Sequence, residues 1–85
     1  MKTIQVTVKS ETGLHARPAS QFVSEASKYS SEIKLIKNEK TVNGKSIMGV
    51  LSLAVTTGET LMITVDGQDE DNAIECLRAL FNNGL

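Results

Sequence analysis

The strongest constraint on the fold is the segment "TLMITVDG", residues 60–67, in which the apolar residues Leu61, Ile63 and Val65 occupy every second position. Alternation of this kind places the two sets of side chains on opposite faces of a strand, so that one face is buried. Antiparallel sheets commonly keep one face in water, whereas parallel sheets are covered on both faces. The segment therefore predicts an antiparallel sheet with a single buried face.

Three further segments resemble short strands: residues 4–8 ("IQVTV"), 32–37 ("EIKLIK") and 40–42 ("KTV"). The dipeptide "NE" at 38–39 is a plausible turn between the last two, and "NG" at 43–44 ends the second of them. The predicted exposed face of the sheet carries mostly polar side chains, namely Gln5, Thr7, Lys34, Met62 and Thr64.

Three segments have the apolar spacing of helices. The first has a stripe at Ala19, Phe22, Val23 and Ala26, with Pro18 in a first turn where its missing N–H has no cost. The last follows the acidic residues 69–71, stops at "NNG", residues 82–84, and has a stripe at Ala73, Ile74, Leu77, Leu80 and Phe81.

The middle helix is predicted in "IMGVLSLAV", residues 47–55, after Ser46. In this helix Ile47, Val50 and Ala54 are expected to face the core, and Met48 to point elsewhere as an adaptable apolar contact. Gly49 weakens the prediction, because glycine inside a helix costs about 1 kcal/mol relative to alanine.

The order of elements is therefore β-α-β-β-α-β-α. It indicates an α+β fold, a two-layer open-faced β-sandwich in which a four-stranded antiparallel sheet carries three helices on one face. A chain of 85 residues has too little core for two domains, so residues 1–85 are expected to form one domain.

Composition excludes several classes of protein. The net charge of −1 argues against a general nucleic-acid binder, and an RNA-reading sheet would need exposed aromatic side chains that the chain does not supply. No apolar run approaches the roughly 20 residues of a membrane span, and "MKTIQVTVKS" lacks a signal-peptide core. The single Cys76 cannot form an internal disulfide, so a reducing cytoplasm is the expected location.

The only histidine of the chain, His15, lies in "ETGLHARPAS", residues 11–20, directly before the first predicted helix. The positive field of a helix N-terminus favours a neutral, nucleophilic imidazole. The free N–H groups at that end can hold a phosphate, and the fork of donors on Arg17 matches a phosphoryl group. Gly13 gives the backbone freedom to pass close by. These residues favour a site that accepts a phosphoryl group on His15.

Other interpretations of His15 exist. A lone histidine at a helix start can cap the helix or lie idle on the surface, and the residues alone favour that interpretation. A metal site is less favoured, since no second histidine exists and Cys76 lies on a distant helix. A free-standing enzyme is also disfavoured, because no general base or nucleophile elbow accompanies His15. No cofactor or metal is expected.

The second motif is "TVNGKSIMGV", residues 41–50. Its "GKS" does not make a nucleotide-binding loop, because a glycine is missing five positions before Gly44, where Glu39 stands. Ser46 instead has the character of a helix N-cap. A phosphate added there would be tolerated by the helix N-terminus and would change the surface charge.

Together these motifs resemble the HPr family, the histidine-containing phosphocarriers of the phosphoenolpyruvate-dependent sugar phosphotransferase system. "TGLHARPA" at 12–19 is similar to the family's active-site signature, and "KSIMG" at 45–49 to its regulatory serine signature in Gram-positive bacteria. The resemblance spans the whole chain. It implies the open-faced sandwich and a cytoplasmic carrier, not an enzyme, that acts as a monomer.

The resemblance also implies roles for residues. His15 would take the phosphoryl group on Nδ1 from enzyme I and pass it to enzyme IIA domains, and Arg17 would steady it. HPr kinase/phosphorylase would phosphorylate Ser46, and that form would bind catabolite control protein A. The residues expected at partner interfaces are Pro18, Ser20, Lys45, Ile47, Met48 and Leu51.

Two alternatives within the family are regulatory paralogues that act mainly as protein-binding modules. The catabolite-repression paralogue resembles HPr but lacks the active-site histidine, so His15 argues against it. A nitrogen-related homologue is disfavoured by "KSIMG".

Overall fold

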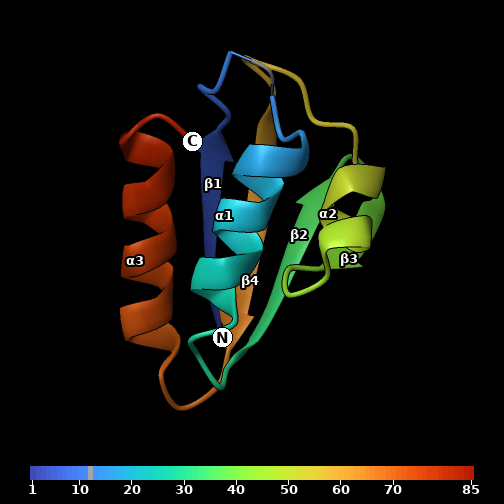
Figure 1. Ribbon diagram of the computed structural model, residues 1–85. Coiled ribbons are helices and arrows are strands. Elements are labelled where there is room, and N and C mark those ends of the chain that lie inside the picture. The colour runs from blue at the N-terminus through green and yellow to red at the C-terminus, as the bar shows by residue number, and fades with distance from the viewer. Residues whose placement is uncertain (12) are drawn as a thin grey trace.

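A computed structural model describes residues 1–11 and 13–85, and shows one four-stranded sheet with three helices on one face (Figure 1). The elements in chain order are β1 (Lys2–Thr7), α1 (Ala16–Ala26), β2 (Glu32–Lys37), β3 (Lys40–Asn43), α2 (Ile47–Ser52), β4 (Thr60–Asp66) and α3 (Glu70–Asn82). This order and architecture confirm the predicted open-faced α+β sandwich.

The strands are arranged β1-β4-β2-β3, and each neighbouring pair is antiparallel. The inner strand β4 pairs with both β1 and β2, and Ile63 lies opposite Ile4 on one side and Leu35 on the other. The predicted polar face is confirmed, since no side chain assigned to it is buried and Met62 is 40% exposed.

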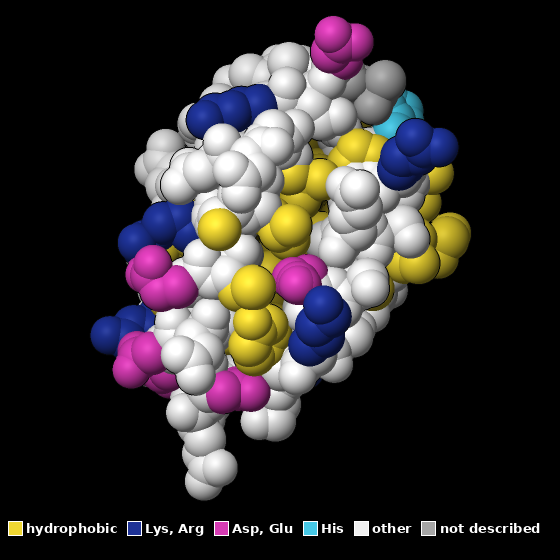
Figure 2. All heavy atoms as spheres, turned by 60° about the vertical axis from the view of Figure 1, so that its left-hand side comes forward, with side chains coloured by type: hydrophobic (Ala, Val, Ile, Leu, Met, Phe, Trp, Pro, Cys, Tyr) yellow, Lys and Arg dark blue, Asp and Glu magenta, His cyan; other side chains and the backbone are white. Residues whose placement is uncertain are grey.

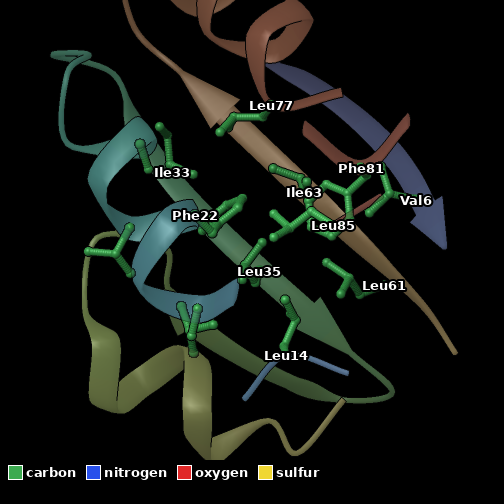
Figure 3. Close-up of a cluster of buried hydrophobic side chains, with 14 of the residues drawn as sticks. Val6, Leu14, Phe22, Ile33, Leu35, Leu61, Ile63, Leu77, Phe81 and Leu85 are labelled. Atoms are coloured by element: carbon green, nitrogen blue, oxygen red, sulfur yellow. The ribbon is translucent and has the colours of Figure 1, made fainter. Parts of the chain in front are cut away.

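The hydrophobic core fills the space between the helices and the inner face of the sheet (Figure 3). Phe22 of α1 and Phe81 of α3 lie with ring centroids 5.9 Å apart at an interplanar angle of 58°, a tilted arrangement that aromatic pairs prefer. Ile33, Leu35 and Ile63 reach them from the sheet with no exposed surface. Side chains this completely buried each stabilise the fold by about 1.5–3 kcal/mol.

Helix α2 differs from its prediction. It ends at Ser52, because the N–H groups of Leu53 and Ala54 donate to carbonyls three residues back and Ala54 then adopts a positive φ of 51°. The expectation that Ile47 and Ala54 face the core is wrong: Ile47 is 43% exposed and Ala54 is also exposed. Within the helix only Val50 is buried.

After α2 the core is filled instead by Leu53 and Val55, which are 4% and 2% exposed. They lie in the segment 53–59, which joins α2 to β4 and is called the connector below. Burial of every second residue, Leu53 and Val55, is typical of an extended chain. A continued helix would instead have placed Ala54 in the core.

Candidate functional site

His15 is the N-cap residue of α1, and its backbone is extended, with φ −82° and ψ −169°. Its carbonyl accepts the first helical hydrogen bond, from the N–H of Ala19 at 2.8 Å. The imidazole makes no capping hydrogen bond to the helix, and the side chain is exposed. Figure 2 shows the histidine at the molecular surface beside a basic side chain. The ring is therefore available to a reactant.

The N-terminus of α1 supplies backbone donors next to this ring. Ala16 and Arg17 open the helix, Pro18 has no N–H, and the N–H of Ala19 is used by His15. None of the described residues accepts a hydrogen bond from Ala16 or Arg17 N–H. Two amides and the helix dipole thus favour an anion at this point.

A depression of about 550 Å³ lies around His15 and is lined by Glu11, His15, Ala16, Arg17, Pro18, Thr56 and Thr57. Arg17 is exposed on the first turn of α1, so its guanidinium borders the same space. The structure thus brings the predicted pair His15 and Arg17 together. Thr56 and Thr57 were missed in the sequence, where "TTGE" at 56–59 indicates only a loop.

Thr56 and Thr57 form one wall of the depression. The only signal for this wall in the sequence is the spacing Thr56-x-x-Glu59, in which a hydroxyl residue precedes a carboxylate by three positions. In the structure Glu59 Oε1 accepts from the N–H and from the hydroxyl of Thr56, both at 2.8 Å. These bonds, led by that of the N–H, lower the pKa of Glu59 to about 2.

Gly13 has the role that its position predicts. Its φ is +69°, and a Cβ at this position would lie 2.4 Å from the carbonyl oxygen of Val55. The same oxygen accepts a hydrogen bond from the N–H of Leu14 at 2.9 Å. Only a residue without a side chain allows the backbone before His15 to lie this close to the connector.

Ser46 is the N-cap of α2, as predicted. Its Oγ accepts a hydrogen bond from the N–H of Gly49 at 3.2 Å, and its side chain is partly buried. Helices α1 and α2 pack against each other, so the segments beginning at His15 and Ser46 belong to neighbouring helices on one side of the sheet (Figure 1).

The other predicted partner-binding residues divide into two groups. Met48 is 76% exposed and Ile47 43%, while Leu51 is partly buried against the core, so α2 presents an apolar surface. Lys45 is partly committed to the fold, because its Nζ donates to the carbonyl of Tyr29 at 2.6 Å.

Pro18 and Ser20 also line a larger hollow of about 1060 Å³, which extends from α1 to the end of α3. Pro18 is buried and Ser20 is exposed, so only Ser20 offers its side chain to a partner.

Within residues 1–11 and 13–85 no three potential ligands from His, Cys, Asp and Glu come together as a metal site. Over the same residues no helix has the length and apolar character needed to cross a bilayer.

The fold and the exposed histidine at a helix N-terminus define a class: small open-faced α+β sandwiches that present one histidine to solvent. A family model described as "PTS HPr component phosphorylation site" matches residues 2–83. The chain therefore belongs to the HPr family of phosphocarrier proteins, and the resemblance seen in the sequence is confirmed.

Relatives include proteins named HPr and proteins named Crh. The HPr-like protein Crh of Halalkalibacterium halodurans is 52% identical over 75 residues, which are 88% of this chain and 89% of that protein. The phosphocarrier protein HPr of Lysinibacillus sphaericus is 48% identical over 80 residues, 94% of this chain and 91% of that protein. Among solved structures, HPr-C-His from Thermoanaerobacter tengcongensis is 46% identical, with a TM-score of 0.96 over 99% of this chain and 94% of that one.

Proposed function

We propose that the protein carries a phosphoryl group on Nδ1 of His15, accepts it from phosphorylated enzyme I and passes it to enzyme IIA domains that serve sugar uptake. The observation that supports this most directly is the position of His15: its ring is exposed and uncapped at the N-terminus of α1, beside two amides that donate to none of the described residues. The protein itself is a carrier in the cytoplasm and not an enzyme, because the partner proteins contribute the remaining catalytic groups.

The chemistry is an in-line transfer. The lone pair of Nδ1 forms the N–P bond while the bond from phosphorus to the donor breaks, and the reverse exchange loads the next acceptor. Negative charge on the equatorial oxygens is stabilised by the N–H groups of Ala16 and Arg17 and by the Arg17 guanidinium. Neither a metal nor a cofactor of the carrier is required by this step.

Ser46 would be the regulatory site. HPr kinase/phosphorylase would transfer the γ-phosphoryl group of ATP to Ser46 Oγ, with ADP as the leaving group and release of the hydroxyl proton, and catabolite control protein A would recognise that form. The apolar surface of Ile47, Met48 and Leu51 supports docking beside the phosphate, because Ile47 and Met48 are exposed without a packing role that explains them. Pro18, Ser20 and Lys45 would lie at the edges of the same interfaces. The Lys45 side chain is held in place there by its hydrogen bond to the carbonyl of Tyr29.

A second candidate is a regulatory paralogue that works mainly through protein binding. Two relatives named HPr-like protein Crh, from Halalkalibacterium halodurans and Bacillus subtilis, are 52% and 49% identical to this chain. The exposed His15 favours the carrier, since a purely regulatory module has no use for a reactive imidazole at this place.

The oligomeric state is proposed to be monomeric, but solved relatives include dimers. One is the Bacillus subtilis Crh described as a swapped dimer, with 45% identity and a TM-score of 0.79 over 100% of this chain and 98% of that one. Another is an HPr dimer from Thermoanaerobacter tengcongensis. Light scattering across a range of protein concentrations decides between the two states.

The test of the proposed function is incubation with phosphoenolpyruvate and enzyme I, followed by intact mass measurement before and after brief acid treatment. A phosphocarrier gains one acid-labile phosphoryl group. A chain that gains none from enzyme I, yet is phosphorylated by HPr kinase/phosphorylase, is the regulatory paralogue.

A further inference from the structure

A partly buried ion pair between Lys37 and Glu59 lies next to the depression around His15 but is not part of its lining. Glu59 Oε1, which already accepts two hydrogen bonds from Thr56, also lies 3.0 Å from Nζ of Lys37 at the end of β2. The Lys37 side chain is 16% exposed and that of Glu59 40%. Partial shielding from water makes this pair stronger than an ordinary surface ion pair.

Lys37 also binds the first residues of the connector. Its Nζ donates to the carbonyls of Leu53 at 3.3 Å and Ala54 at 3.0 Å, where α2 has just ended and the chain takes a positive φ. One ammonium group therefore fixes both the start of the connector and, through Glu59, its end.

The connector in turn holds the backbone that precedes His15. Val55 accepts from the N–H of Leu14, and the Thr57 hydroxyl donates to the carbonyls of Ser10 at 2.5 Å and Glu11 at 3.0 Å. Figure 1 shows the two segments meeting at one end of the molecule, above the N-terminus of α1.

We propose that Lys37 and Glu59 are positioning residues for phosphoryl transfer at His15. They touch no reacting atom; they fix the connector, which sets the backbone before His15 and the Thr56–Thr57 wall of the depression. This inference rests on the proposed carrier function. Because a misplacement of about 1 Å can reduce a reaction roughly 100-fold, partial loosening of the connector predicts a rate loss of about three- to tenfold.

The experiment measures initial rates of His15 phosphorylation by enzyme I and phosphoenolpyruvate, over a range of carrier concentrations, for Lys37→Met. The expected result is a kcat lower by about three- to tenfold with KM changed less than about twofold, because the interface with enzyme I is retained. Lys37→Arg should recover most of the rate, since it keeps a charged donor. Lys34→Met is the matched control: Lys34 forms a 3.6 Å ion pair with Glu32 on the exposed sheet face.

A second measurement does not depend on transfer. Hydrogen exchange of the Leu14 amide should be faster in Lys37→Met and in Glu59→Ala than in the wild type, and unchanged in Lys34→Met. The positioning role is refuted if the folded variants keep the wild-type kcat and the same Leu14 exchange. It is also refuted if KM rises while kcat stays at the wild-type value. If instead the wild-type chain gains no acid-labile phosphate, the carrier function itself fails, and the exchange result still decides whether the pair holds the connector.

Discussion

The carbonyl of Val55 accepts the N–H of Leu14 at 2.9 Å and stands 2.4 Å from the place where a side chain on Gly13 would begin. One backbone oxygen thus sets the path of the chain into the proposed phosphoryl site. The contact joins the loop between β1 and α1 to the connector, two parts of the sequence some 40 residues apart.

Gly13→Ala should destabilise the protein by roughly 2 kcal/mol or more, because it combines a strained positive φ with a clash against backbone atoms. Urea denaturation measures this change. Gly58→Ala is the control, since Gly58 also has a positive φ, of +89°, but no atom stands near its added Cβ. Equal losses for the two variants would show that the clash with Val55 contributes nothing.

His15→Ala should abolish acid-labile phosphorylation by enzyme I and leave the melting temperature nearly unchanged. The side chain is exposed and caps nothing, so its removal costs no packing or hydrogen bond to the helix. Intact mass and thermal unfolding report the two effects. An acid-labile phosphate on the variant would place the carrier site elsewhere.

Arg17→Ala should slow phosphoryl transfer by about 10- to 100-fold while barely moving the melting temperature, because the guanidinium acts on the transferred group. Arg78→Ala is a suitable control: Arg78 is the other arginine, paired with Glu75 at 2.9 Å on α3. A large loss of stability with normal transfer would make Arg17 a structural residue.

Ser46→Asp should fold normally and accept phosphate at His15 more slowly, and the deficit should depend on salt. A phosphate at Ser46 would take the net charge from −1 toward about −3, and the added charge would weaken an electrostatic encounter with enzyme I. Ser46→Ala should transfer normally, escape the kinase and lose about 1 kcal/mol of stability with its N-cap.

Ser52→Asp tests whether position matters in that comparison. Ser52 is exposed at the other end of the same helix, so the variant adds the same charge away from the N-cap. Initial rates of His15 phosphorylation, measured at low and high salt, should be lower for Ser46→Asp than for Ser52→Asp. Equal rates for all three variants would leave Ser46 as an ordinary cap.

Asp69 should contribute to stability in a pH-dependent way. Its carboxylate accepts hydrogen bonds from the N–H of Ser30 at 2.9 Å and of Ser31 at 3.0 Å, and from the Ser31 hydroxyl. The Ser31 hydroxyl above all, with these amides, lowers the pKa of Asp69 below its ordinary 3.8. The stabilisation is therefore complete above the unfolded pKa and is lost as pH falls through the lower folded pKa.

Asp69→Asn should accordingly be less stable than the wild type near neutral pH, and this difference should shrink as pH falls below about 4. Denaturation at a series of pH values measures it. Asp71→Asn, which removes an exposed charge in the first turn of α3 and its surface ion pair with Lys2 at 3.3 Å, serves as the comparison. A difference that grows on acidification would contradict the assigned pKa direction.

The sequence predicted the sheet and the outer helices because their burial repeats with a clear period. Phe22 and Phe81 mark the buried stripes of α1 and α3, and Ile63 that of β4. Helix α2 was predicted too long, since "IMGVLSLAV" is almost uniformly apolar and offers no polar face to fix its period. Just beyond its end at Ser52, the carbonyls of Leu53 and Ala54 accept hydrogen bonds from Lys37 of β2, a long-range contact that no local pattern reveals.

The candidate site divides in the same way. His15, Arg17 and Ser46 could be predicted because helix starts have local signals in the sequence. Thr56 and Thr57 could not, because their place beside His15 is created by contacts between the connector and the chain before α1. The structure brings them to the site without any local pattern that marks them as functional.

Helix α2 is anchored by one fully buried side chain, Val50. The free energy of opening α2 locally is therefore expected to be lower than the free energy of opening the sheet. Local stability follows the apolar surface that a segment buries, so the amides of α2 should exchange with solvent sooner than those of β4. The turn around Ser46 is therefore expected to open locally while the sheet stays intact. Under the proposed regulation, an enzyme that modifies Ser46 would need to unwind only this turn and not the rest of the folded molecule.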